Sequence, residues 1–200
     1  MFENMNGYDF DDTIFKGNSF RRFYFYCLVR LPYLVLYLPV QLFAAILHGL
    51  HILNKHRFLC VLEWFIVFVP RKRRFVQKFW NKNFKRVKSW YLRQKREDDL
   101  VLSASPQYLV EVACERLGVK CIASQVDIKT GKTLGKHCHG KTKADIYRQH
   151  FGETELETFY SDSLTDTPML RLAKYGYLVK GDKITLLYRD GSEITSGNLS

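Results

Sequence analysis

The chain contains no Cys-x-x-Cys pair, and its five cysteines among 200 residues are an odd number. These absences exclude a small disulfide-stapled domain and a zinc finger with ordinary ligand spacing. The first ten residues also lack the basic and apolar run of a cleavable signal peptide. We therefore expect a reducing, cytoplasmic setting in which the N-terminus is retained.

One long segment lacks charge altogether, and another lacks acidic residues. Residues 31–54 carry no Asp, Glu, Lys or Arg, and residues 71–96 carry 12 Lys and Arg but no acid. The net charge is +11, yet outside residues 71–96 the chain has 19 cations against 20 acids. The excess positive charge is therefore local, which favours an anionic partner such as a membrane surface, a polyanionic substrate or nucleic acid.

Strand-like and helix-like segments alternate in the second half of the chain. Apolar runs predict strands at residues 99–102, 158–161 and 177–179. Helices are predicted at residues 105–117, 141–150 and 167–175, with Ser105 as the N-cap of the first and Gly176 as the stop of the last. A further short strand is predicted at residues 5–11 and a hairpin at residues 125–134. This alternation predicts an α/β fold with a mostly parallel sheet covered by helices.

The segment between the first strand and residue 98 is predicted to be helical. Its basic part carries one apolar stripe with spacings of four, four, three and four residues, typical of a single amphipathic helix. The stripe consists of Val76, Trp80, Phe84, Val87 and Tyr91. A chain of this length can hold one core and one accessory piece, so we assign residues 1–14 and 98–200 to the core and residues 15–97 to a helical insertion.

Polar side chains lie where the predicted strands end, at the edge where parallel α/β sheets carry their reactive residues. Asp9 and Asp11 are two residues apart on an extended segment, so one carboxylate can attack while the other handles protons. Ser103 follows the second strand. Asp162 and Asp166 flank the end of a later strand, and their hard oxygen ligands suit Mg²⁺.

These spaced elements, together with a lysine between them, resemble the motifs of the haloacid dehalogenase superfamily of phosphatases. The Asp-x-Asp-x-Thr motif falls on residues 9–13, the hydroxyl motif on Ser103, the lysine motif on Lys143 and the acidic motif on residues 162–166. The branch that the chain resembles includes phosphoserine phosphatases and phosphatidylglycerophosphate phosphatases. The resemblance implies a Rossmann-like core with a mostly parallel sheet, and an inserted α-helical cap.

By this resemblance the chain is an Mg²⁺-dependent phosphomonoesterase. Asp9 would be the nucleophile that becomes an aspartyl phosphate, and Asp11 the general acid and base. Lys143 would act in catalysis and, with the Ser103 hydroxyl, bind the substrate phosphate. The metal ligands implied are Asp9, the backbone carbonyl of Asp11, and Asp162, with Asp166 in support.

Two nearby lysines, Lys136 and Lys141, are alternatives to Lys143. We favour Lys143 because Cys-x-Gly-x-x-Lys over residues 138–143 resembles the pattern of the branch. The run His-Cys-His at residues 137–139 offers metal-ligand side chains, but adjacent residues point in different directions and do not converge on one ion. We assign this run no metal.

The apolar segment at residues 31–54 leaves two interpretations open. About 20 apolar residues span a bilayer as a helix, but Pro32, Pro39 and Gln41 interrupt this segment. A cap and its core must share one side of a membrane, which excludes a single crossing. A wholly soluble cap remains an alternative, and we favour a peripheral or re-entrant contact at the inner face of the membrane, because the neighbouring basic helix suits an anionic leaflet.

We expect the substrate to be a phospholipid or another amphiphilic phosphate monoester, similar to phosphatidylglycerophosphate. The run at residues 103–106, Ser-Ala-Ser-Pro, resembles the lipid-phosphatase side of the branch. The alternatives are a phosphatase for phosphoserine or another small molecule, and a non-catalytic protein that binds lipid or nucleic acid. Nucleic acid is not expected, because the aromatic residues of the basic segment lie on a stripe that is predicted to be buried. The sequence does not determine the oligomeric state.

Overall fold

A seven-stranded sheet organises the part of the chain that the computed structural model describes, residues 5–152, 154 and 156–194. The strand order is β3-β2-β1-β4-β5-β6-β7, and the pairs from β3 to β5 are parallel. The last two pairs are antiparallel. The strands are β1 (Asn6–Tyr8), β2 (Leu100–Pro106), β3 (Lys120–Ser124), β4 (Leu156–Ser161), β5 (Ala173–Lys180), β6 (Lys183–Arg189) and β7 (Ser192–Glu193). The predicted α/β fold with a mostly parallel sheet is confirmed.

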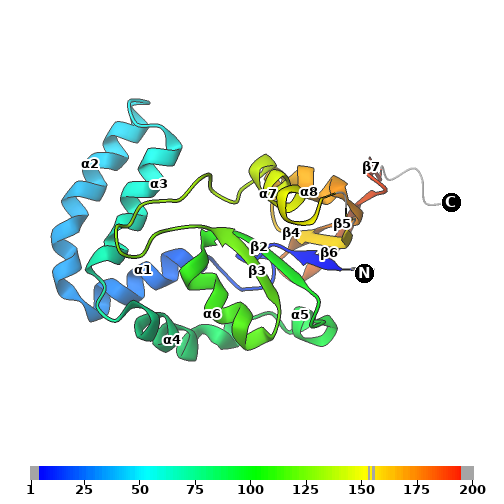
Figure 1. Cartoon of the computed structure of the whole chain (residues 1–200), viewed down its shortest axis with the longest axis horizontal. Coiled ribbons are helices and arrows are strands. Elements are labelled where there is room, and N and C mark those ends of the chain that lie inside the picture. Colours follow the sequence, from blue (N-terminus) through cyan, green and yellow to red (C-terminus); the bar gives the residue numbers. More distant parts are fainter. Residues whose placement is uncertain (1–4, 153, 155, 195–200) are drawn as a thin grey trace.

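Helices cover both faces of the sheet and extend beyond one end of it (Figure 1). The helices are α1 (Ser19–Arg30), α2 (Leu38–Gly49), α3 (Lys55–Glu63), α4 (Lys72–Asn83), α5 (Ser89–Gln94), α6 (Gln107–Leu117), α7 (Lys141–Phe151) and α8 (Thr167–Leu172). Short 3₁₀ turns lie between them at η1 (Pro32–Tyr37), η2 (Trp64–Phe68), η3 (Phe84–Arg86) and η4 (Leu164–Asp166). We call residues 19–68 the helical arm, because α2 and α3 lie away from the sheet in Figure 1.

Strand β2 divides its side chains between two hydrophobic cores, because successive residues of a strand point to opposite faces of the sheet. Val101 lies in the larger core, which contains residues of α1, α4, α5 and α6. Leu100 and Leu102 lie in the smaller core, against α7 and α8. Helix α4 is tied to the larger core by Trp80, whose indole Nε1 donates to the Leu109 carbonyl at 2.7 Å. The division into core and cap at residues 14 and 98 stays a prediction.

The predicted amphipathic helix at residues 76–91 is not continuous. Helix α4 ends at Asn83, and Val87 instead forms an antiparallel bridge with Phe15 in the segment after β1. The Lys88 amide donates to the Ile14 carbonyl at 2.7 Å, and the Lys16 amide donates to the Arg86 carbonyl at 2.9 Å. This pairing takes the backbone groups that a helix would use. The apolar residues of the stripe are largely buried on both sides of the break. Their spacing therefore indicated which side chains are buried, and not that they belong to one helix.

The helix predicted at residues 167–175 is too long, because α8 ends at Leu172 and strand β5 follows at once. Gly176 is therefore a strand residue and not a helix stop. A Cβ atom at Gly176 would lie 2.4 Å from the Leu170 carbonyl oxygen, far inside contact distance. Glycine at this position lets α8 pack directly on the strand beside it.

We expect Gly176→Ala to lower the free energy of unfolding by about 1–3 kcal/mol, the usual cost of forcing extra volume into a packed core. Urea unfolding followed by circular dichroism measures this loss. Gly49→Ala at the end of α2 is the matched control, because its Cβ would meet no atom within 4 Å. Equal unfolding midpoints for Gly176→Ala and the unsubstituted protein would contradict the packing explanation.

Candidate active site

The central strand β1 ends at Tyr8 and delivers Asp9 to the edge where the parallel strands finish. The Asp9 amide still donates to the Tyr160 carbonyl of β4, at 2.8 Å, so the backbone of Asp9 is fixed by the sheet. β1 lies between β2 and β4 in the sheet, so Ser103 lies on one neighbouring strand and Asp162 directly follows the other. This is the edge at which open α/β sheets bind their ligands.

A buried lysine joins two carboxylates at this edge. Lys143, near the start of α7, is 1% exposed, and its Nζ lies 2.7 Å from Asp9 Oδ1 and 2.6 Å from Asp166 Oδ2. Burial alone would lower the pKa of Lys143, but the carboxylates of Asp9 and Asp166 outweigh it and raise that pKa. Burial also raises the pKa of Asp9, and the Lys143 charge opposes this rise. Lys143 is thus a permanent cation beside Asp9.

Asp166 is held by three donors. Besides Lys143, the Ser161 hydroxyl donates to its Oδ2 at 3.0 Å and the Gly140 amide to its Oδ1 at 3.2 Å. Its carboxylate therefore positions Lys143 and the loop before α7. Lys136 and Lys141, the two alternatives to Lys143, are exposed.

Asp11 points toward the helical arm and the end of β2. The Ser19 amide at the start of α1 donates to Asp11 Oδ1 at 2.6 Å, and the Ser105 hydroxyl donates to Oδ2 at 2.5 Å. Burial raises the pKa of Asp11 to about 6, against the lowering effect of these hydrogen bonds. A carboxyl group with this pKa can both give and accept a proton near neutral pH.

Ser105 was predicted to cap the helix that follows it, and that prediction is wrong. Ser105 and Pro106 are the last residues of β2, and α6 begins at Gln107 without a side-chain cap. Ser103 is buried, and its hydroxyl oxygen accepts from the Ser105 amide at 3.2 Å. Of these two serines, it is Ser105 whose hydroxyl contacts a carboxylate of this edge, that of Asp11.

Thr13 connects Asp9 to the end of β4. Its hydroxyl donates to Asp9 Oδ2 at 3.3 Å and accepts from the Asp162 amide at 2.8 Å. Asp162 is half-buried, and its pKa is raised to about 6 by burial first and then by the negative charges of Asp9 and Asp12. Two carboxylates in this relation repel each other unless a cation compensates them.

The residues at this edge fit a divalent cation. Asp9 and Asp162 offer hard carboxylate oxygens of the kind that Mg²⁺ takes in proteins, usually one or two per ion together with water and substrate phosphate. A bound dication would also compensate the negative charges of Asp9 and Asp12, which add to the effect of burial in raising the pKa of Asp162. Asp166, in contrast, already has Lys143 and two further donors.

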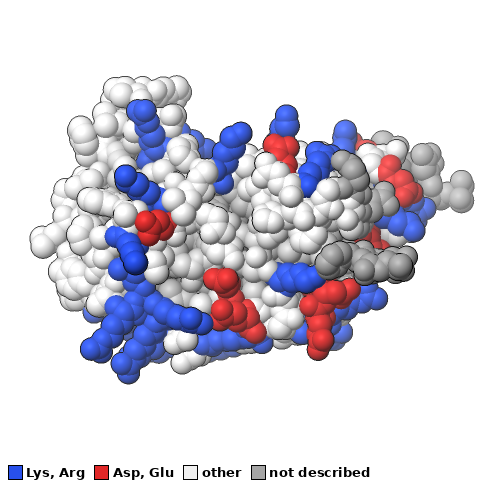
Figure 2. Space-filling view, viewed as in Figure 1, with Lys and Arg blue, Asp and Glu red and all other residues white. Residues whose placement is uncertain are grey.

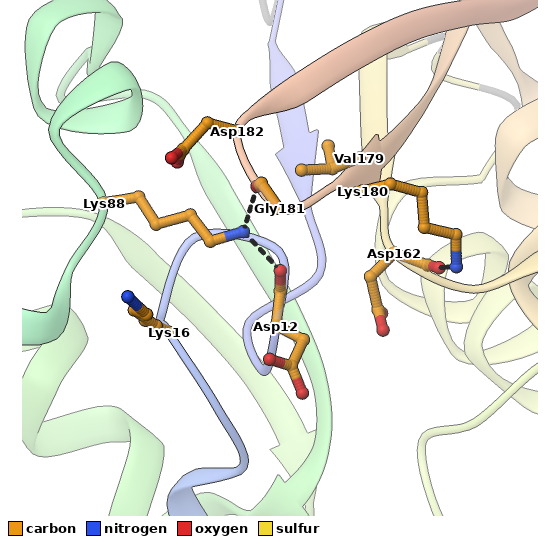
Figure 3. Close-up of a pocket in the computed structure, with 8 residues that line it drawn as sticks. All are labelled: Asp12, Lys16, Lys88, Asp162, Val179, Lys180, Gly181 and Asp182. Atoms are coloured by element: carbon orange, nitrogen blue, oxygen red, sulfur yellow. Dashed lines mark hydrogen bonds between the residues drawn. The ribbon is translucent and has the colours of Figure 1, made fainter.

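A pocket of about 380 Å³ adjoins the site on the side of Asp162. Figure 3 shows the Asp162 side chain at one wall and the side chains of three lysines around the hollow. Lys88 Nζ donates to the Asp12 and Gly181 carbonyls at 2.6 and 2.7 Å, and Lys180 Nζ donates to the Asp162 carbonyl at 2.5 Å. The lining residues are Asp12, Lys16, Lys88, Asp162, Val179, Lys180, Gly181 and Asp182. The pocket is therefore lined by three lysines and three aspartates, and two of the lysines are engaged by backbone carbonyls.

Sequence reasoning missed three contacts in this site. Ser19 and Ser105 hold Asp11, and the Thr13 hydroxyl links Asp9 to Asp162. Thr13 lies in the first motif, which was a usable signal for its place. Nothing in the sequence indicates Ser19, because its contact with Asp11 is made by a backbone amide.

A sequence profile of the haloacid dehalogenase-like hydrolase family matches residues 7–171 of the chain. No curated protein matches it. The family match and the fold bear out the resemblance seen in the motifs at the level of the superfamily.

Several solved structures share the fold. A protein of unknown function from Bordetella pertussis Tohama I has a TM-score of 0.66 and 14% identity, covering 84% of this chain and 85% of that one. A hydrolase of the same family from Salmonella enterica subsp. enterica serovar Typhi has a TM-score of 0.54 and 12% identity, covering 86% and 61%. A phosphoserine phosphatase, solved as an analogue of its phospho-aspartyl intermediate, has a TM-score of 0.50 and 16% identity, covering 85% of this chain and 83% of that one. At these identities the likeness is one of fold.

We expect Lys143→Met to lower the free energy of unfolding by about 3–5 kcal/mol, because it leaves two buried carboxylates without their cation. Lys141→Met, on the exposed face of the same helix, should cost far less. Chemical denaturation at neutral pH measures both. If Lys143→Met unfolded at the same midpoint as Lys141→Met, Lys143 would not be the buried counter-charge that its contacts describe.

Proposed function

Because this chain belongs to the haloacid dehalogenase-like hydrolase family, we propose that it is an Mg²⁺-dependent phosphatase that works through an aspartyl phosphate on Asp9. The observation that carries the proposal is the buried Lys143 cation held against Asp9, with Asp11 two residues further along the chain. A carboxylate next to a fixed positive charge is an arrangement suited to phosphoryl transfer, where catalysis is mainly positioning and charge neutralisation.

In the first step Asp9 attacks phosphorus. The bond from the Asp9 carboxylate oxygen to phosphorus forms while the bond from phosphorus to the leaving oxygen breaks. Asp11 gives its proton to that leaving oxygen, so the product departs as a neutral alcohol. Lys143 stays charged throughout and offsets the negative charge that gathers near Asp9.

In the second step water replaces Asp9 on phosphorus. Asp11, now a carboxylate, accepts a proton from the water as its oxygen bonds to phosphorus and the bond to Asp9 breaks. Inorganic phosphate and the free Asp9 carboxylate result. The hydrogen bonds from Ser19 and Ser105 keep Asp11 in one orientation for both proton transfers.

Mg²⁺ when bound supplies positive charge to the phosphoryl oxygens. Asp9, the backbone carbonyl of Asp11, and Asp162 would hold it, and Asp166 would support the site by fixing Lys143. Ser103 lies buried within the neighbouring strand β2, and we assign its hydroxyl to the substrate phosphate.

We expect Asp9→Asn to abolish phosphate release, because an amide does not form the aspartyl phosphate. Colorimetric release of phosphate from p-nitrophenyl phosphate measures the loss, and a chelator should remove the wild-type activity until Mg²⁺ is restored. Asp98→Asn, at an exposed aspartate outside the site, is the matched control. Phosphate release by Asp9→Asn at the wild-type rate would exclude Asp9 as the nucleophile.

For the substrate, we propose a phosphate monoester carried by a lipid. The support is the surface of the helical arm, where many large apolar side chains are exposed. They include Phe25, Val29, Val35, Leu36, Leu42, Phe43, Ile46, Leu50 and Ile52. The helical stretch Pro32–Gly49 is long and apolar enough to cross a membrane by length and composition, and only 22% of it is buried. A core helix of a soluble protein would be mostly buried.

Charge on the neighbouring surface supports the same partner. Figure 2 shows mainly uncharged surface over the arm and a group of Lys and Arg side chains below it, where α4 begins in Figure 1. Arg71, Arg73, Arg74 and Lys78 are exposed there. Cations next to an apolar face are the features that bind an anionic lipid surface, each adding roughly 1 kcal/mol near the leaflet. We therefore propose that the arm binds the inner face of the membrane and that the protein lies on the cytoplasmic side.

We expect Leu36→Asp/Phe43→Asp to reduce binding to vesicles that contain phosphatidylglycerol at least about tenfold, because carboxylates do not enter the acyl region. Sedimentation with the vesicles measures binding, and activity on p-nitrophenyl phosphate should stay unchanged. Lys174→Asp, at an exposed position of β5 in the core, is the control for added negative charge. Unchanged vesicle binding would reject the membrane proposal. So would a stable dimer in analytical ultracentrifugation that the two substitutions convert to monomer, because a second copy would then cover the apolar face.

A substrate panel separates the lipid phosphatase from its alternative. We expect turnover of phosphatidylglycerophosphate in mixed vesicles to exceed turnover of phosphoserine. Turnover of phosphoserine alone would favour the small-molecule alternative and leave the roles of Asp9 and Asp11 untouched.

A further inference from the structure

Three potential metal ligands meet between the helical arm and the loop that leads to the active-site lysine. His56 and Cys60 lie one turn apart on α3, and His137 belongs to the loop between β3 and α7. One ligand atom of each lies within 4.8 Å of the other two. The rings of His56 and His137 have centroids 5.3 Å apart, and Cys60 Sγ lies 3.8 Å from His56 Nε2.

A buried carboxylate borders this cluster. Glu63, on the next turn of α3, is 4% exposed, and its Oε1 lies 3.8 Å from His137 Nδ1. The Thr133 hydroxyl donates to Glu63 Oε2 at 3.0 Å and lies 3.2 Å from Cys60 Sγ. Acids are seldom buried without a cation or a full set of donors. Burial raises the pKa of Glu63 to about 7, and the hydrogen bond from Thr133 only partly opposes this rise. A cation bound beside Glu63 would favour its charged form.

One ring nitrogen of His137 lacks a hydrogen-bond partner among the described residues. This nitrogen is Nε2, and it is buried. A metal ion on one ring nitrogen and a carboxylate facing the other is the pairing that orients histidine ligands in metal sites. The arrangement of Glu63, His137, Cys60 and His56 is consistent with that pairing.

We propose that His56, Cys60 and His137 bind one zinc-class divalent ion, with Glu63 as a fourth ligand or as the carboxylate that orients His137. Imidazole and thiolate are the ligands of Zn²⁺, and they discriminate against Mg²⁺, which prefers oxygen. Bond lengths of about 2.3 Å to sulfur and 2.0 Å to nitrogen place two tetrahedral ligands of this set roughly 3.3–3.5 Å apart. The three ligand atoms now lie within 4.8 Å of one another, so a bound ion would draw them closer together, and His56 is the exposed member of the set.

The ion would fasten the arm to the core. Near this cluster the arm and the loop before α7 are also joined by the Thr133 contacts and by the Trp64 indole, which donates to the Thr130 carbonyl at 2.9 Å. This site is distinct from the carboxylates that would hold Mg²⁺, and it does not depend on the proposed phosphatase activity. The neighbouring Cys138 is buried in the smaller core and takes no part.

Cobalt substitution tests the site without measuring activity. The full-length protein, freed of metal with a chelator and returned to Mg²⁺ buffer, is titrated with Co²⁺ under reducing conditions. We expect one equivalent to bind with a thiolate-to-cobalt charge-transfer band, and Zn²⁺ to displace it. Asp162→Asn should keep the band, because the catalytic carboxylates carry no sulfur ligand.

Variants assign the ligands. Cys60→Ser should abolish the charge-transfer band, and both Cys60→Ser and His137→Ala should weaken Zn²⁺ binding at least about a hundredfold, whereas Glu63→Gln should cost about 10–100-fold if it only orients His137. Cys121→Ser and His150→Ala, at a cysteine and a histidine outside the cluster, are the matched controls. Circular dichroism of each metal-free variant shows whether the fold is kept.

Either of two results would overturn the proposal. The first is the absence of a bound equivalent when folded wild-type protein is dialysed against micromolar Zn²⁺. The second is an unchanged charge-transfer band in folded Cys60→Ser, which would move the metal to another cysteine.

Discussion

The ion triplet formed by Asp9, Lys143 and Asp166 is the constraint on which the rest of the site depends. A charge that is almost wholly buried is stable only with partners at hydrogen-bond distance, and Lys143 has two carboxylates within 2.7 Å. Because these three residues come from β1, α7 and the segment after β4, their pairing fixes the relative positions of three separate parts of the chain. The same contact that compensates the buried charge places a cation where a phosphoryl group would meet Asp9.

The remaining polar contacts extend this constraint to the helical arm. Thr13 joins Asp9 to the Asp162 amide, and Asp11 is joined to Ser105 at the end of β2 and to the first amide of α1. Since α1 begins the arm, a displacement of the arm would act directly on the hydrogen bonds of Asp11. The proposed acid–base residue and the proposed membrane surface are therefore connected by one helix.

Much of this arrangement was predictable from the sequence, for identifiable reasons. The aspartates and Lys143 are named by motif spacing, and the parallel sheet by the alternation of strands and helices. The break in the helix before Val87 was not predictable from the sequence. The bridge that causes it joins Val87 to Phe15, more than 70 residues away, and the apolar spacing continues through the break without change. Gly176 was misread because glycine ends helices and also permits close packing, and only the distance to the Leu170 carbonyl distinguishes the two uses.

The approach of His56 and Cys60 to His137 illustrates the same limit in a chemical setting. The residues at 137–139 were rejected as a metal site on the ground that neighbours do not converge, and that reasoning still holds for Cys138, which lies in the smaller core. The sequence did not indicate that α3 would supply the other ligands, because α3 and this loop are far apart in the chain and meet only in the folded structure. Ligands contributed by two elements tie those elements together, whereas ligands within one run do not. The arm is attached to the core at its start, through Ser19 and Asp11, and again at α3, through this cluster. The apolar helix α2 lies between these two attachments, so its position relative to the core is fixed on both sides.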